Sequence, residues 1–114
     1  MAKGNHLGDF EQLVMLAVMR LGPGAYGMTV RREIEANSGR HVSLGAIYST
    51  LDRLEDKGFV SSALGETTAE RRGRAKRFFK VQPPGVRALQ DALAALDRMR
   101  KGIKELDHPI GAES

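Results

Sequence analysis

Few side chains in this 114-residue sequence are suited to catalysis or to metal binding. Cysteine is absent, so neither a disulfide nor a thiolate metal site can form. The three histidines, His6, His41 and His108, lack the spacing of a zinc site. Ser49 has no nucleophile elbow around it. We therefore expect neither an enzyme nor a bound metal or cofactor, and the remaining chemistry is that of binding.

Basic residues supply that chemistry. Lys and Arg number 18 against 14 Asp and Glu, which gives a net charge of +4 and a pI near 9.8. A third of the basic residues follow Glu70 in one short run: Arg71, Arg72, Arg74, Lys76, Arg77 and Lys80. Such a cluster can neutralise the phosphates of a nucleic acid, although a charge run is more often a solvated surface. The position of the run in the fold decides between these two interpretations.

Residues 43–60 predict a second polar surface, carried by a helix. Apolar residues recur there at steps of three and four: Leu44, Ile47, Leu51 and Leu54. Ser43 is placed to cap this helix, and Gly58 to close it in the left-handed conformation. The opposite face is small and polar near its start: Ser43, Ala46, Ser49, Thr50 and Arg53. A face of this kind allows close approach to a polar surface such as the major groove of DNA.

A first helix is predicted over residues 10–21. Asp9 and Gln12 fit a capping box at its start. The segment is apolar on more than one side, so we expect it to be buried in the core or between two subunits. The following residues, 22–27, match the dinucleotide pattern G-x-G-x-x-G. Because they follow a helix instead of a strand, we interpret them as a turn.

Residues 26–37 predict a second helix, and a brief turn joins it to the polar-faced helix, as in a helix-turn-helix. Residues 59–64 and 75–82 predict two strands of a hairpin, with a long polar tip at residues 65–74. The basic run therefore lies on a hairpin that follows the third helix. This order predicts a winged helix-turn-helix, a mainly α fold with a small β-hairpin.

The last segment, residues 83–107, predicts one long amphipathic helix. Its apolar residues recur at three and four: Val86, Leu89, Leu93, Leu96, Met99, Ile103 and Leu106. A helix of about 33 Å is longer than a domain of this size needs to cover its own core. We expect it to form a dimer seam together with Phe10 and Leu13 of the first helix. The alternative is a helix packed only on its own subunit.

Residues 45–60 resemble the signature of the PadR family, in which a Gly and a Tyr precede Leu-x-Arg-Leu-Glu-x-x-Gly. Residues 73–81 and Gly85 are similar to the family's wing strand and the start of its last helix. The resemblance covers roughly residues 13–96, and it departs at Gln82-Pro83 and at Phe78-Phe79. It implies a bacterial winged-helix regulator of the short class, whose single C-terminal helix and first helix build the dimer. It also implies a possible small-molecule effector at the dimer interface.

We thus expect a homodimeric, ligand-responsive repressor that binds a palindromic double-stranded operator. Residues 9–82 would form the DNA-binding domain and residues 83–107 the dimerisation helix of the same compact unit, with flexible tails at 1–8 and 108–114. The sequence has neither a signal peptide nor a spanning segment, which indicates a cytoplasmic protein. The expected DNA-binding residues are Arg31, Arg32, Ser43, Gly45, Ala46, Tyr48, Ser49, Thr50, Arg53, Arg71, Arg72, Arg74 and Lys76. The expected dimer residues are Phe10, Leu13, Leu89, Leu93, Leu96, Met99, Ile103 and Leu106.

A protein-interaction module is the alternative function. In that case the basic hairpin would bind an acidic protein instead of DNA. Binding to duplex DNA that weakens with salt would separate the two functions.

Overall fold

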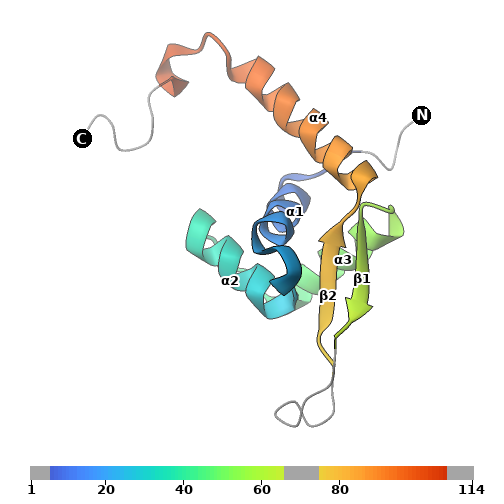
Figure 1. The fold of residues 1–114 in the computed structure, drawn as a ribbon. Coiled ribbons are helices and arrows are strands. Elements are labelled where there is room, and N and C mark those ends of the chain that lie inside the picture. Colours follow the sequence, from blue (N-terminus) through green and yellow to red (C-terminus); the bar gives the residue numbers. More distant parts are fainter. Residues whose placement is uncertain (1–5, 66–74, 108–114) are drawn as a thin grey trace.

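The computed structural model describes residues 6–65 and 75–107 of the chain. In chain order the elements are α1 (Asp9–Leu21), η2 (Gly22–Gly24), α2 (Gly27–Ser38), α3 (Leu44–Asp56), β1 (Val60–Leu64), β2 (Arg77–Val81), α4 (Pro83–Arg100) and η4 (Lys104–Leu106). Three helices and a hairpin form the body, and α4 projects from it (Figure 1). None of the helices in the described ranges combines the length and apolar character needed to cross a membrane.

The first helix begins one residue earlier than a cap at Asp9 would allow. Gly8 is the N-cap, and its backbone N–H donates to Oε1 of Glu11 at 2.9 Å. Gln12 donates its side-chain amide to the carbonyl of Leu7 at 3.2 Å. Leu7 is buried in the core, so the expected flexible tail over residues 1–8 is wrong for this residue.

The helix-turn-helix is closed by backbone and side-chain hydrogen bonds. Gly39 ends α2 in the left-handed conformation at φ 73°, so that α2 extends one residue beyond the end that the sequence predicted near residue 37. Ser43 caps α3, and its Oγ accepts the Ala46 N–H at 3.0 Å. Gly58 follows α3 at φ 79° and turns the chain into β1. The expected caps of α3 are therefore confirmed.

The hairpin is antiparallel, and its register runs from the Val60–Val81 pair to the Leu64–Arg77 pair. An isolated bridge between Tyr26 and Phe78 joins the hairpin to the start of α2. Beside it, Phe79 donates its backbone N–H to the carbonyl of Ala25 at 2.9 Å. These bonds fix the hairpin, hereafter the wing, against the helical body, as expected of a winged helix-turn-helix.

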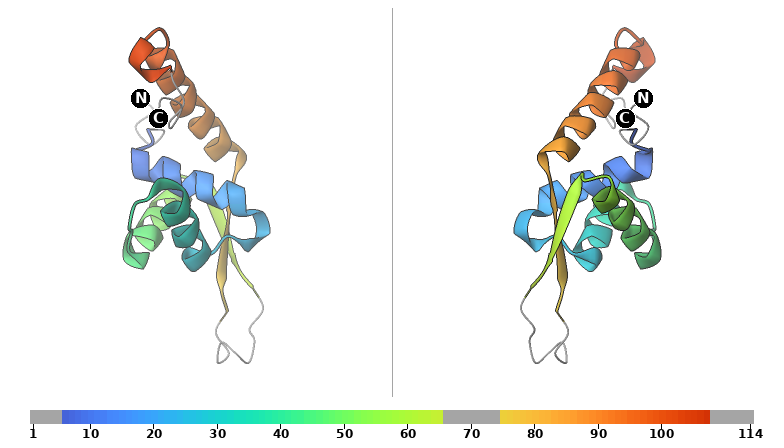
Figure 2. Two further views of the ribbon diagram at one scale, coloured as in Figure 1. Left: turned by 90° about the vertical axis from the view of Figure 1, so that its left-hand side faces the viewer. Right: turned by 90° about the vertical axis from the view of Figure 1, so that its right-hand side faces the viewer.

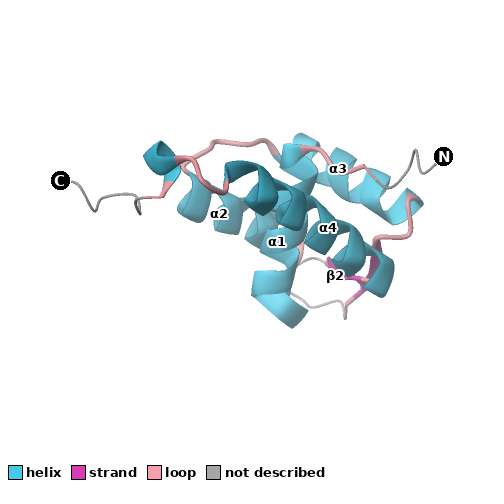
Figure 3. Ribbon diagram, turned by 90° about the horizontal axis from the view of Figure 1, so that it is seen from above, coloured by secondary structure: helices cyan, strands magenta, loops and turns pink. Residues whose placement is uncertain are grey.

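Every element of the body contributes to one apolar core. Fully buried side chains come from α1, α2, α3 and β1: Val14, Met15, Val30, Ile47, Leu51, Leu54 and Val60. From above, α4 lies over α1 (Figure 3). The start of α4 is seated closely, because a Cβ on Gly85 would overlap the carbonyl oxygen of Phe59.

The C-terminal helix is shorter than the sequence predicted. It ends at Arg100, and Gly102 turns the chain at φ 83° before η4. The prediction of one helix through residue 107 is therefore wrong at its far end, because the chain takes the left-handed conformation that glycine permits. Figure 2 shows α4 extending away from the body on its way to this turn.

Candidate nucleic-acid interface

One side of α3 is open to solvent over its first two turns. Gly45, Ala46, Tyr48 and Ser49 are exposed, whereas the opposite side of the helix is fully buried. Thr50 differs from expectation, since it is only 2% exposed and its hydroxyl accepts from the Arg53 guanidinium at 3.2 Å. It lies next to Leu51 on the core side, so its side chain does not face outward. The small polar face consists of the remaining residues.

Gly45 has no side chain, so the backbone of α3 is directly accessible at this position, and the surface of the helix is called low here in that sense. A Cβ there would meet only Oγ of Ser43, at 3.9 Å, so nothing in the described fold requires a glycine. Glycine in a helix costs about 1 kcal/mol relative to alanine. A glycine in this helix could serve close packing on α2 or close approach by a partner molecule, and the open space around Gly45 excludes the first. Close approach by a partner molecule remains.

The side chain of Tyr48 is packed against the fold on one side and open to solvent on the other. Its ring lies against Gly27 at the start of α2, where a Cβ would overlap the phenol. The residue is nevertheless 38% exposed. A tyrosine in this position packs with its ring and leaves part of its surface in contact with water. It can thus both brace α2 against α3 and reach a bound molecule.

Three arginines of α2 and α3 remain at the surface. Arg32 is exposed, and Arg31 lies 3.5 Å from Glu35 in an i,i+4 ion pair. The Arg53 side chain is 56% exposed and lies 3.6 Å from Glu11. The Arg31–Glu35 pair is partly exposed and therefore weak, so Arg31 can exchange the carboxylate for a phosphate. Glu11 is buried, but the guanidinium of Arg53 keeps enough exposed surface to contact a phosphate as well.

A buried carboxylate fixes the far end of α3 to α1. Oε2 of Glu11 lies 3.1 Å from Nζ of Lys57, which also donates to the carbonyl of His6. Burial raises the pKa of Glu11, but the Gly8 N–H, Lys57 and Arg53 together lower it below its ordinary value. The carboxylate is therefore charged at neutral pH and holds α3 in place relative to α1.

A second carboxylate holds the turn before α3. Glu35 accepts the backbone N–H of Val42 at 3.2 Å, and it lies near Arg31 and His41. The Val42 N–H, followed by Arg31 and His41, lowers the pKa of Glu35 despite an opposing contribution from desolvation. This contact sets the position of the turn that leads into Ser43, and hence of the N-terminal end of α3.

The wing uses part of its basic cluster within the fold. Nζ of Lys76 lies 4.2 Å from the centre of the Tyr26 ring, a cation–π contact. Arg77 contacts two acidic residues of α3, Asp52 and Glu55. Lys80 is exposed on β2. The remaining predicted wing contacts, Arg71, Arg72 and Arg74, lie outside the described residues.

The predicted dimer residues separate into two groups. Leu89 is buried in its own subunit, so its prediction as an interface residue is wrong, and Phe10, Leu13 and Leu93 are partly buried against the same core. The others expose large apolar side chains: Leu96, Met99, Ile103 and Leu106. Met99 is the most exposed of these, at 77%. The apolar surface of α4 thus begins where its contact with the body ends.

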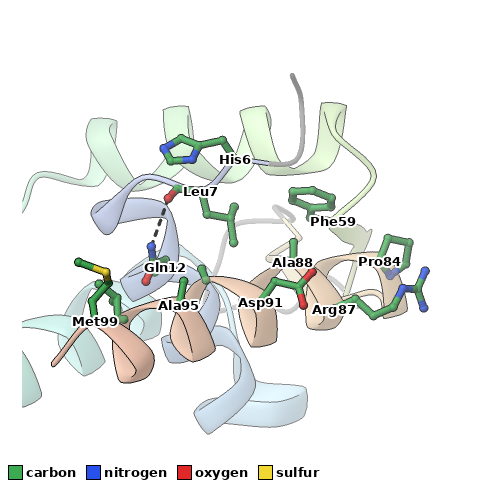
Figure 4. Close-up of a pocket in the computed structure, with 12 residues that line it drawn as sticks. His6, Leu7, Gln12, Phe59, Pro84, Arg87, Ala88, Asp91, Ala95 and Met99 are labelled. Atoms are coloured by element: carbon green, nitrogen blue, oxygen red, sulfur yellow. Dashed lines mark hydrogen bonds between the residues drawn. The ribbon is translucent and has the colours of Figure 1, made fainter. Parts of the chain in front are cut away.

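A groove of about 620 Å³ runs between α4 and the N-terminal segment. Its floor is largely apolar, with Leu7, Phe59 and Ala88, and Met99 lies at one end (Figure 4). Arg87 and Asp91 line the side formed by α4. A second groove, of about 550 Å³, lies between the wing and the end of α1 and includes Met19 and Phe78.

Sequence reasoning missed several residues that position this surface. The buried role of Glu11 was not anticipated, although its spacing from Gly8 is that of a helix start. The packing of Gly27 against Tyr48 has no sequence signal of its own. Arg77 was counted in the basic run without a role of its own, because a charge count does not show which residues of distant elements it contacts.

Comparison with known proteins agrees with this architecture. The model of the transcriptional regulator PadR-like family matches residues 15–91. A comparison with curated protein sequences gives no significant match. Among solved structures, a PadR family transcriptional regulator from Eggerthella lenta is similar at 23% identity and a TM-score of 0.65, over 83% of this chain and 80% of that chain.

Two further structures extend the likeness of fold. A PadR family regulator from Clostridium difficile is similar at 16% identity and a TM-score of 0.69, over 86% of this chain and 97% of that one. A transcriptional regulator from Clostridium thermocellum is similar at 18% identity and a TM-score of 0.66, over 86% and 92%. With the family match covering most of α1 through the first half of α4, the chain belongs to the PadR-like family of transcriptional regulators.

Proposed function

We propose that the protein is a homodimeric regulator that binds double-stranded DNA at specific sequences and acts as a ligand-responsive repressor. The observation that carries this proposal is the open, small-residue face at the start of α3, where Gly45, Ala46 and Ser49 leave the helix surface low. A helix presented in this way can enter the major groove with its N-terminal residues near the base edges.

The roles of the residues follow from their positions. Ser43, Gly45, Ala46 and Ser49 would lie nearest the base edges, and Tyr48 could donate its hydroxyl to a phosphate. The basic residues would bind the flanking phosphates: Arg31, Arg32, Arg53, Arg71, Arg72, Arg74 and Lys76. None of the four residues expected nearest the base edges is an Asn, Gln or Arg that could make a bidentate base contact. Recognition would therefore depend strongly on DNA shape and phosphate contacts.

The dimer would place two copies of α3 on one duplex. The exposed apolar residues of α4, including Leu96 and Met99, give it a surface that a second copy can cover. We propose that residues 83–107 supply this interface and residues 9–82 the DNA-binding domain. A symmetric dimer favours a palindromic operator. An effector would bind where the two copies meet, next to the groove between α4 and the N-terminal segment.

Selection from a random duplex pool tests the proposal. Purified protein is incubated with the pool, bound duplexes are amplified, and several rounds are sequenced. We expect enrichment of one motif with two inverted half-sites about 10 base pairs apart. Equal recovery of all sequences would contradict specific DNA binding, and enrichment of a single half-site would contradict the dimer.

The alternative is a module that binds an acidic protein through the wing. The basic run between Arg71 and Lys80 supports it, because such charge does not distinguish a phosphate backbone from a carboxylate surface. Titration with duplex DNA over a salt series separates the two. Specific DNA binding predicts a selected duplex bound far more tightly than a scrambled one, whereas the alternative predicts weak and equal binding of both.

A further inference from the structure

Arg77 forms a closed network between the wing and α3. Its Nε donates to Oγ of Ser62 at 3.1 Å, its Nη1 to Asp52 at 3.3 Å and its Nη2 to Glu55 at 2.6 Å. Ser62 in turn donates to the other oxygen of Glu55 at 2.9 Å. The guanidinium also lies 5.0 Å from the centre of the Phe79 ring. One side chain thereby joins both strands of the wing to the same face of the helix.

The position of this network matters more than its strength. The wing leaves α3 through the short link at Gly58, and Val60 pairs with Val81 near that link. Arg77 pairs with Leu64 at the other end of the ladder, about 13 Å away along the strand. The wing is thus joined directly to α3 at two separated points, the chain link at Gly58 and the Arg77 network. Backbone bonds at Ala25 and Tyr26 hold the same strand to the start of α2, and the Arg77 network adds a direct side-chain tie to α3.

The charges around Arg77 argue against a phosphate contact. Two carboxylates, Asp52 and Glu55, are within 3.3 Å of its guanidinium, and all three of its nitrogens already donate hydrogen bonds. A phosphate would have to displace these acceptors and then lie beside two negative charges. Lys80, three residues along the same strand, lies on the other face and is exposed.

We propose that Arg77 is a positioning residue for operator selection, which fixes the angle of the wing to α3 and does not bind DNA itself. The inference rests on the proposed function. If the angle is held, α3 and the wing contact one duplex in register, and the protein favours sequences whose shape fits that spacing. Without the network, each element still binds phosphates, but the selected sequence loses its advantage.

Arg77→Met is the test, and Lys80→Met is its control, because both remove one positive charge from the same strand. Affinities for the selected duplex and a scrambled duplex are measured by fluorescence anisotropy over a salt series. We expect Arg77→Met to lose about tenfold selectivity, roughly the effect of one lost base contact, relative to Lys80→Met. A similar drop for both duplexes, with a salt slope shallower by about 0.9, would show a phosphate contact and overturn the proposal.

Glu55→Gln gives an independent test, because it makes the protein more positive. Electrostatic attraction alone predicts tighter binding of both duplexes. Loss of the network predicts weaker binding of the selected duplex with unchanged or tighter binding of the scrambled one. Selectivity equal to that of the wild type would overturn the proposal.

Arg77→Lys keeps the charge but loses the planar fork, so we expect it to lose selectivity with an unchanged salt slope. This variant and Glu55→Gln decide the question if Arg77→Met fails to fold, as shown by melting curves. Retained selectivity in Arg77→Lys would overturn the proposal. Failure of the wild type to enrich any sequence would instead refute the proposed function, before any variant is compared.

Discussion

Two helices of this protein each bury one side and expose the other, but their exposed sides differ in kind. α3 buries four residues among 13 and exposes a small polar face that includes Gly45 and Ser49. α4 buries only Gly85 and Leu89 among 18 residues and exposes Leu96 and Met99. The side that a helix leaves exposed indicates the kind of surface it can bind.

A polar surface of small side chains suits a hydrated and charged partner. It exposes few apolar atoms to water, so it needs no apolar partner to cover it. An apolar surface suits another protein chain, since burying it contributes about 25 cal/mol per Å². The same periodicity in the sequence predicts both helices. From their different exposed residues we propose that α3 binds DNA and that α4 binds a second copy of the chain.

The largest effect should come from the buried side of α3. Leu51 is fully buried, and Leu51→Ala should lower the free energy of unfolding by about 3 kcal/mol through lost burial and a cavity. Chemical denaturation measures this loss, which should be the same at low and high protein concentration. A loss that varied strongly with protein concentration would contradict a core that is complete within one subunit.

The exposed side of α4 should behave in the opposite way. Leu96→Asp combined with Met99→Asp places charge on an apolar surface that we expect to be buried between subunits. Dimer dissociation should become easier by about 2 kcal/mol or more. Sedimentation at several concentrations measures this. Leu96→Asn combined with Met99→Asn is the control of the same size without the charge. An unchanged mass of the Asp variant would contradict the role given to α4.

Glu11 connects α3 to α1, and its contribution should depend on pH. Glu11→Gln should cost about 1 to 2 kcal/mol at neutral pH, because Lys57 loses a buried counter-charge. The pKa of Glu11 is lowered from 4.5 in the folded state, so this stabilisation is complete above that value and is lost as the pH falls through the folded pKa.

Chemical denaturation at a series of pH values from 7 downward tests the direction of this pH dependence. The difference between wild type and Glu11→Gln should be constant down to about pH 5 and should shrink below it. A difference that grows in acid would contradict a charged Glu11.

The smallest effect concerns the exposed side of α3. Gly45→Ala should stabilise the fold by about 0.5 to 1 kcal/mol, because alanine favours the helix and its methyl group meets only Oγ of Ser43, at an unstrained 3.9 Å. Duplex binding should nevertheless weaken, since the methyl group raises the low surface. A melting curve and a binding titration on the same sample measure both. Unchanged binding would show that the low surface at Gly45 has no role in recognition.

The sequence predicted the body of the fold because each element carries a local signal. Ser43 and Gly58 mark the ends of α3, and the apolar stripe marks its buried face. The signal failed where a tertiary contact decides the outcome. Thr50 lies at the edge of the stripe, where packing turned it inward. The end of α4 is a separate case, because the chain becomes extended at Lys101 and left-handed at Gly102 although the apolar repeat continues to Leu106.

The candidate site was less predictable than the fold. Residue type placed Arg77 in the basic run but did not suggest its partners, Asp52 and Glu55, which are distant in the sequence and lie on α3. Glu11 and Lys57 are likewise 46 residues apart, so neither suggested the other. Such pairs depend on how helices cross, which local periodicity does not specify.

Ser49→Glu tests the central claim most directly, because Ser49 is exposed on α3 and its substitution fills no core space. The selected duplex should bind at least about a hundredfold more weakly, since a carboxylate would lie against base edges and phosphates. The melting temperature and dimer mass should stay close to those of the wild type, as for other surface changes. Intact binding by a folded dimer would contradict recognition through α3, and lost stability would contradict the placement of Ser49 on its open face.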